Sequence, residues 1–134
     1  MTTEPSPAIA ISTKDGPAAL GPYSQAVRAG AYIYVSGQTP INPATGEIED
    51  DTITGQALQA INNIAAILAA ADASLDDVVK TTVLLANMAD FAEVNAVYAR
   101  CFTGGILPAR ATYQVAALPK AALIEIEAIA YKPV

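Results

Sequence analysis

The stretch Ile124-Glu125-Ile126-Glu127-Ala128-Ile129-Ala130, near the C-terminus, decides the fold of this chain. Its strict alternation predicts a half-buried β-strand, because successive side chains of a strand point to opposite faces. The apolar positions 124, 126, 128 and 130 would face a core, while Glu125 and Glu127 would share the other face. That second face is either a solvated sheet surface or a place where chemistry occurs. Since the chain contains no histidine, acid–base work near neutral pH falls on carboxylates such as these.

The composition indicates one domain that associates with copies of itself. The 134 residues fit a single domain spanning 1–134, in which residues 1–8 are expected to form a flexible tail. Apolar residues make up 53% of the chain, and a domain of this size buries only about 68–70% of its unfolded surface. A homo-oligomer is therefore expected. The net charge of −6 argues against nucleic-acid binding, which needs positive charge to displace phosphate counterions.

Several residue types are too scarce for common kinds of site. A single cysteine, Cys101, cannot form an internal disulfide, which fits a reducing compartment. The N-terminus lacks the pattern of a secretory signal, and no apolar stretch reaches the ~18 residues of a membrane span. We therefore expect a cytoplasmic protein without membrane contact. Without histidine, a Ser-His-Asp triad and an imidazole-thiolate zinc site are excluded, and no glycine-rich phosphate loop follows a strand. We expect no metal and no cofactor.

The periodicity along the chain predicts a fold with both helices and strands. Strands are predicted over 9–12, 31–36, 78–86, 110–116 and 123–131. One helix is predicted to begin at Asp51 or Thr52, with a buried stripe of Ile53, Ala57, Ile61, Ile64 and Leu68. The order ββ-α-β-α-ββ then predicts an α+β fold in which both helices pack on one face of a single mixed sheet.

The second helix has its own start and stop signals. Asp90 followed by Glu93 resembles a capping box, and Gly104-Gly105 is expected to end the helix. Its predicted buried stripe consists of Phe91, Val94, Tyr98 and either Cys101 or Phe102.

Polar side chains from three strands are predicted to meet on the face that the helices leave open. These are Ser36 on one strand, Arg110, Thr112 and Gln114 on a second, and Glu125 and Glu127 on a third. The tyrosines at 32, 34 and 131 fall on the same face. This mixture suits a subunit interface that contains a small pocket, although a solvated face is the alternative.

Arg110 is the strongest candidate for a substrate-binding residue on this face. Its planar guanidinium suits a carboxylate, which it can bind through two parallel hydrogen bonds. The alternative is a salt bridge to Glu125 or Glu127. In a partly apolar pocket the pKa of Glu125 would rise above its usual ~4.3 and suit proton transfer. Three further residues have alternatives to a place in the site. These are loop packing for Tyr23, a surface or capping role for Asn95 and core packing for Cys101.

The motifs, taken together, resemble those of one known family. In chain order they are Gly21-Pro22-Tyr23-Ser24-Gln25-Ala26, Ser36-Gly37-Gln38, Asn42-Pro43 with Thr45-Gly46, Val79-Lys80-Thr81-Thr82-Val83, Phe91-Ala92-Glu93-Val94-Asn95, Pro108-Ala109-Arg110 and the stretch 124–130. This set strongly resembles the RidA/YjgF family of reactive-intermediate deaminases, from about Lys14 onward.

The resemblance implies a chorismate-mutase-like α+β fold, a homotrimer and pockets between neighbouring subunits. It implies cofactor-free hydrolysis of 2-imino acids and their enamine tautomers to 2-keto acids and ammonia. In the family, pyridoxal-phosphate enzymes such as threonine dehydratase release these imines. By the same resemblance, Arg110 would hold the substrate carboxylate, Glu125 would activate water, and Tyr23, Ser36, Gly37, Asn95 and Thr112 would contact the substrate or line its pocket.

Two positions depart from the family pattern. Many members have cysteine where Thr112 stands, and several have glutamate where Gln114 stands. A related deaminase acting on another imine and a non-catalytic ligand-binding regulator or holdase remain alternatives. Ribonuclease activity, sometimes attributed to relatives, fits poorly with the acidic charge and the absence of histidine. The hypothesis requires Arg110 and Glu125 to open into one cleft between chains. Their placement on opposite sides of the sheet, or of both in bulk solvent in the assembled protein, would contradict it.

Overall fold

The computed structural model describes residues 7–134, and within them six strands form one mixed sheet. The strands are β1 (Ile9–Ile11), β2 (Ala26–Ala29), β3 (Tyr32–Gln38), β6 (Val78–Leu85), β7 (Ala109–Gln114) and β8 (Ile124–Tyr131). Their order across the sheet is β1-β2-β3-β8-β6-β7. The pair β6 and β7 is parallel, and all other neighbours are antiparallel.

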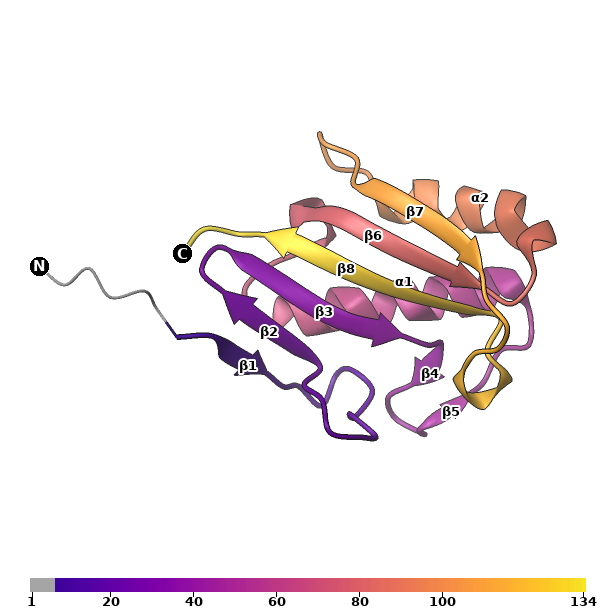
Figure 1. The fold of residues 1–134 in the computed structure, drawn as a ribbon, viewed down its shortest axis with the longest axis horizontal. Helices are drawn as coiled ribbons and strands as arrows, with labels where there is room; N and C mark the ends of the chain where they lie inside the picture. Colours follow the sequence, from indigo (N-terminus) through magenta and orange to yellow (C-terminus); the bar gives the residue numbers. More distant parts are fainter. Residues whose placement is uncertain (1–6) are drawn as a thin grey trace, which may run out of the picture.

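Two helices, α1 (Ile53–Ala69) and α2 (Phe91–Cys101), lie on the same side of this sheet (Figure 1). Helix α2 connects β6 to β7, as a crossover between parallel strands requires. A hairpin of β4 (Ile41–Asn42) and β5 (Glu47–Ile48) precedes α1. The predicted α+β fold, with both helices on one face of a mixed sheet, is confirmed. No helix in the described part of the chain is both long and apolar enough to span a membrane.

The start of α1 follows from its cap. Thr52 is the N-cap, and its hydroxyl accepts a hydrogen bond of 3.1 Å from the backbone N–H of Gly55. The Asp50 carboxylate accepts hydrogen bonds from the backbone N–H and the hydroxyl of Thr52, which holds the cap in place. All five residues of the predicted stripe are buried, namely Ile53, Ala57, Ile61, Ile64 and Leu68.

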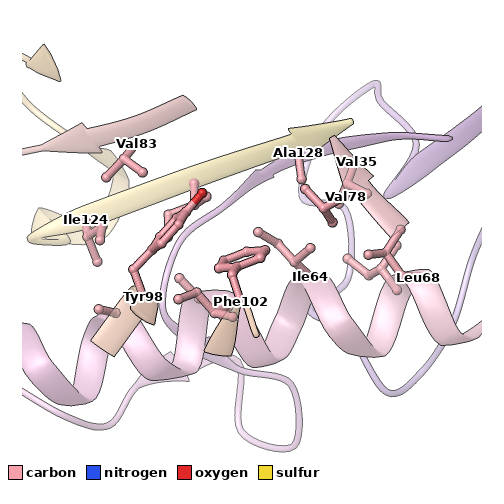
Figure 2. Packing of buried hydrophobic residues seen from close by; sticks show 14 of the residues in the cluster. Val35, Ile64, Leu68, Val78, Val83, Tyr98, Phe102, Ile124 and Ala128 are labelled. Carbon is pink, nitrogen blue, oxygen red and sulfur yellow. The ribbon is translucent and has the colours of Figure 1, made fainter. Parts of the chain in front are cut away.

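The hydrophobic core fills the space between the helices and the covered face of the sheet (Figure 2). Helix α1 contributes Ile64 and Leu68, α2 contributes Tyr98, and the residue after α2 contributes the ring of Phe102. The sheet contributes Val35, Val83, Ile124 and Ala128, together with the fully buried Ile126 and Ala130. The face assigned to positions 124, 126, 128 and 130 is therefore confirmed.

The structure adds elements that the sequence pattern did not predict. Strand β2 was missed because Arg28 stands where an apolar residue would mark the covered face. Its guanidinium instead donates hydrogen bonds to the backbone oxygens of Lys132 and Ala71, at 2.8 and 3.1 Å. The hairpin β4–β5 was also missed, and its turn spans the motif residues Asn42-Pro43 and Thr45-Gly46. Gly46 closes that turn with a φ of +74°, a conformation that glycine adopts without strain.

Two predictions about α2 were wrong. Asp90 makes no side-chain capping hydrogen bond, because the preceding 3-10 turn Met88–Asp90 leads directly into the helix. That turn is capped by Asn87, whose side chain accepts from the backbone N–H of Ala89. Phe91 is 36% exposed rather than buried. Of the predicted N-terminal tail, residues 1–6 lie outside the described part, and residues 7–8 are exposed and irregular.

Candidate active site

The register of β7 decides where Arg110 lies. In the parallel pair, Arg110 is opposite Thr81 and Thr112 is opposite Val83. Thr81 and Val83 are fully buried beneath the helices. Because residues in register share a face of the sheet, Arg110 and Thr112 lie on the helix-covered side. Gln114 follows the same parity, and its side-chain oxygen accepts a hydrogen bond from the backbone N–H of Met88.

The two glutamates lie on the opposite, open face. Glu125 is opposite Leu84 and Glu127 is opposite Thr82, on the surface that also carries Tyr34 and Tyr131. The predicted face is thus right for the glutamates and wrong for Arg110, Thr112 and Gln114. Arg110 and Glu125 of one chain are on opposite sides of the sheet and do not share a cleft, so the hypothesis as stated from the sequence is wrong for a site built within one chain. The alternative of a salt bridge between them is excluded for the same reason.

A β-bulge brings Gly37 to Glu125. Val35 is opposite Ala128, whereas Gln38 is opposite Ile126, so β3 holds one extra residue between these pairs. A Cβ atom added to Gly37 would lie 2.9 Å from Cδ of Glu125. Only a residue without a side chain therefore leaves the Glu125 carboxylate its position.

Ser36, in the same bulge, holds the loop that carries Tyr23. The Ser36 hydroxyl donates a hydrogen bond of 2.6 Å to the backbone oxygen of Ser24. The Tyr23 backbone N–H donates to the oxygen of Gly21 at 2.8 Å, and its hydroxyl accepts from the N–H of Leu20 at 3.3 Å. The Tyr23 ring is 52% exposed. We call Glu125, Gly37, Ser36 and Tyr23 the glutamate cluster.

The electrostatics of Glu125 suit proton transfer. Burial, together with the negative charge of Glu127, raises the pKa of Glu125 above its ordinary value. The predicted direction of this shift is confirmed. A carboxylate of raised pKa is a stronger base and gives up its proton closer to neutral pH.

Arg110 lies against two aromatic rings of α2. Its guanidinium carbon is 4.8 Å from the centroid of Tyr98 and 5.4 Å from that of Phe91, within the range of cation–π attraction. The ion pairs formed within residues 7–134 are Lys120–Glu47 and Lys132–Asp77, so Arg110 has no carboxylate partner in that part of the chain. The nitrogen fork of Arg110 is thus available to an external anion.

A pocket of about 560 Å³ opens beside this arginine, and its lining is mostly apolar. It is lined by Asn95, Tyr98, Ala99, Phe102, Leu107, Pro108 and Arg110. The side-chain oxygen of Asn95 is buried and has no hydrogen-bond partner among the described residues. Such an acceptor is costly unless it receives a donor. We call Arg110, Asn95 and Thr112 the arginine cluster.

The described residues support neither a metal site nor a reactive thiol. Residues 7–134 contain no group of three or more histidine, cysteine or acidic side chains placed to hold a metal ion. Cys101 is half-buried, and burial raises the pKa of its thiol, which disfavours the nucleophilic thiolate. Sequence reasoning missed Tyr98 and Phe91 as partners of Arg110. Their spacing of seven, with Asn95 between them, marks one stripe of a helix and is the signal that was available.

Comparison with known proteins gives consistent similarities. Residues 13–132 match the family described as Endoribonuclease L-PSP. A 2-iminobutanoate/2-iminopropanoate deaminase of Mus musculus is 52% identical over 120 residues, covering 90% of this chain and 88% of the relative.

Solved structures give the same result for the fold. The YjgF gene product of E. coli shares 47% identity, and the match covers 92% of this chain and 98% of that chain with a TM-score of 0.88. E. coli TdcF with bound serine shares 42% identity, with the same coverage and a TM-score of 0.88.

Proposed function

This chain belongs to the Endoribonuclease L-PSP family, the RidA/YjgF family that its motifs resemble, and we propose that it hydrolyses 2-imino acids. The products are 2-keto acids and ammonia, and the enamine tautomers are substrates as well. Mammalian relatives at 50–53% identity carry the name 2-iminobutanoate/2-iminopropanoate deaminase. The reaction needs a carboxylate anchor and a proton acceptor, and the two clusters supply one each.

One observation supports this proposal more strongly than any other. Arg110 is held against aromatic rings beside a pocket and has no acidic partner among the described residues. A structural arginine normally pairs with an acid or with backbone oxygens, as Arg28 does. A guanidinium without such partners suits a carboxylate that comes from outside. The solved relative with bound serine fits this, because serine carries a carboxylate of the same kind.

We propose that the complete site joins two copies of the chain. Arg110 and Glu125 of one chain lie on opposite sides of the sheet, so they meet only if the open face of one copy packs near the β7 edge of another. The open face carries Tyr32, Tyr34, Tyr113 and Tyr131, each 44–58% exposed, and apolar area of this extent favours an interface. A contact between two different surfaces forms a ring when its rotation closes. We propose the homotrimer with the chorismate-mutase-like fold that the resemblance implies.

The mechanism then follows from the placement of charges. Arg110 of one copy binds the substrate carboxylate, and Glu125 of a neighbouring copy accepts a proton from the water that attacks the imine carbon. The new C–O bond gives a tetrahedral carbinolamine. Glu125 gives this proton to the nitrogen, which completes the NH2 group of the carbinolamine. Glu125 then takes the proton of the new hydroxyl group and passes it to the nitrogen, so that the C–N bond breaks as the C=O bond forms and ammonia leaves. Orientation and one general base suffice for a reaction that proceeds slowly unaided.

Asn95 supplies a further polar contact in this scheme. Its buried oxygen lacks a donor among the described residues, and the imine or carbinolamine nitrogen carries N–H groups. We propose that this oxygen accepts a hydrogen bond from the reacting nitrogen. Thr112 lies two residues beyond Arg110 on the same face of β7 and borders the carboxylate.

The test couples the purified protein to a threonine dehydratase and follows 2-ketobutyrate. We expect the wild-type protein to accelerate its formation from the released imine. Arg110→Ala should reduce this acceleration about tenfold to a hundredfold, because it removes one charge-assisted contact. Arg100→Ala is the matched control, since Arg100 is exposed on α2. Full activity of Arg110→Ala would contradict the carboxylate anchor, and an inactive wild-type protein would contradict the function.

Two other readings are outcomes of the same experiments. Binding of 2-ketobutyrate without turnover would indicate the ligand-binding regulator. Cleavage of RNA would match the family description Endoribonuclease L-PSP, but a net charge of −6 disfavours binding to the negatively charged RNA backbone. We further propose that residues 1–134 act as one domain in the cytoplasm, consistent with a single unpaired cysteine.

A further inference from the structure

Helix α2 presents one stripe of side chains to Arg110, of which Asn95 and Tyr98 line the pocket. Phe91, Asn95 and Tyr98 are spaced by four and three residues, so they lie one above the other on the helix surface. The Arg110 guanidinium lies against the two rings at either end of this stripe. The scheme proposed above gives roles to Arg110 and Asn95 but none to the rings.

Tyr98 is the more firmly fixed of the two rings. Its hydroxyl forms a hydrogen bond of 2.7 Å with the hydroxyl of Thr81, and its ring packs on Phe102 at a centroid distance of 4.3 Å. Figure 2 shows the ring rising from α2 with its oxygen toward the sheet. Tyr98 is only 9% exposed, whereas Phe91 is 36% exposed. The Tyr98 ring therefore has little freedom to turn.

Thr81 links this ring to the strand that carries the arginine. Thr81 is the register partner of Arg110 in the parallel pair of β6 and β7. The residue whose hydroxyl anchors Tyr98 is thus the neighbour of Arg110 on the adjacent strand. Thr81, Tyr98 and Arg110 form a closed unit in which a buried hydroxyl fixes a ring and the ring faces the guanidinium.

We propose that Tyr98 is a positioning residue that pre-orients the Arg110 guanidinium for the substrate carboxylate. This inference rests on the proposed function, because it assigns Arg110 to carboxylate binding. An unsupported arginine on an edge strand samples many rotamers, and binding then has to order it. A ring that attracts the face of the guanidinium supports one orientation and leaves the N–H edge free for the anion.

The charges around Tyr98 agree with this arrangement. Burial raises the pKa of Tyr98, while the hydrogen bond to Thr81 and the positive charge of Arg110 oppose that rise. The hydroxyl thus stays protonated at neutral pH, when the hydrogen bond to Thr81 is needed. The ring acts as a neutral π-surface rather than as a charged partner.

The experiment measures the dissociation constant of 2-ketobutyrate by calorimetry, and KM and kcat in the coupled dehydratase assay. Tyr98→Leu should raise the dissociation constant and KM about 3- to 30-fold, the range expected for a lost cation–π contact, with kcat changed much less. Tyr98→Phe keeps the ring and should recover most of the affinity. Val97→Ala, buried in the same helix but outside the pocket, should leave the dissociation constant unchanged.

A double-mutant cycle separates positioning from general damage to the fold. If Tyr98 acts through Arg110, Tyr98→Leu should have no further effect on affinity in an Arg110→Ala background. Equal effects of Tyr98→Leu in both backgrounds, or wild-type affinity of Tyr98→Leu itself, would overturn the inference. If Tyr98→Leu does not fold, Phe91→Leu takes its place in the same cycle, because Phe91 is 36% exposed. It should raise the dissociation constant by a smaller factor.

These measurements also distinguish a failure of this inference from a failure of the proposed deaminase function. A wild-type protein that binds 2-ketobutyrate but turns over no imine would refute the deaminase function alone. Lack of coupling between Tyr98 and Arg110 in that binding would refute the positioning role alone. A wild-type protein without measurable affinity for 2-ketobutyrate would overturn both.

Discussion

Two inactive variants should restore activity when their subunits are mixed. Arg110→Ala lacks the carboxylate anchor and Glu125→Gln lacks the proton acceptor, so each alone should be impaired. The register places these residues on opposite sides of the sheet within one chain. If each site takes Arg110 from one copy and Glu125 from its neighbour, a mixed oligomer contains some sites in which both native residues meet.

The size of the recovery follows from this geometry. A site is intact only where the copy giving the arginine carries Glu125→Gln and the copy giving the glutamate carries Arg110→Ala. With equal amounts and random assembly, two independent choices leave about one quarter of the sites intact. Arg110→Ala alone should retain about 1–10% of the wild-type activity. The expected recovery lies above that background.

The assay unfolds the two variants in denaturant, refolds them together and measures 2-ketobutyrate formation in the coupled assay. The variants mixed in native form, without subunit exchange, provide the control and should show only the mean of the separate activities. Light scattering of the refolded sample establishes that oligomers have formed. Refolded mixtures no more active than this mean would refute a site shared between Arg110 and Glu125 of different copies.

Three further changes test local features of the structure. Gly37→Ala should reduce the deaminase activity about tenfold or more, since the added Cβ displaces the Glu125 carboxylate. Gly105→Ala is the control and should keep its activity, because there is open space around Gly105. Similar losses of activity in both variants would contradict this role of Gly37. Burial and Glu127 raise the pKa of Glu125, so ionised Glu125 lowers the stability of the folded state as pH rises through that pKa. Glu125→Gln should therefore melt above the wild type at pH 7 and match it below about pH 4 in circular-dichroism melts; a less stable variant at pH 7 would reverse the sign. Thr52→Ala should lose about 0.5–2 kcal/mol in urea unfolding with unchanged activity, and no loss of stability would mean that its cap is dispensable.

Local patterns predicted the main elements because their signals depend only on near neighbours. The stripe of α1 repeats every three or four residues, and the alternation of β8 repeats every two, so each element identifies its own buried face. Strand β2 was not predicted because the charged Arg28 lies on its helix-covered face. Hydrogen bonds to the distant backbone of Ala71 and Lys132 hold it there. No local pattern contains that information.

The face of Arg110 was the principal error, and its cause is physical. Strand β7 lies at the edge of the sheet, and its residues are all exposed or half-buried. It therefore shows no alternation of burial from which a face could be read. Its face depends on the pairing of Arg110 with Thr81, and a slip of one residue would turn Arg110 to the other side.

The sequence by itself determined the class of fold, the family and the identity of the groups able to do chemistry. These properties follow from residue types, short periods and motif spacing. The tertiary structure alone decided that Arg110 and Glu125 occupy opposite sides of one sheet and that Tyr98, anchored by Thr81, faces the guanidinium. The register between β6 and β7 is set by packing between residues about thirty positions apart, and a short-range pattern carries no record of it.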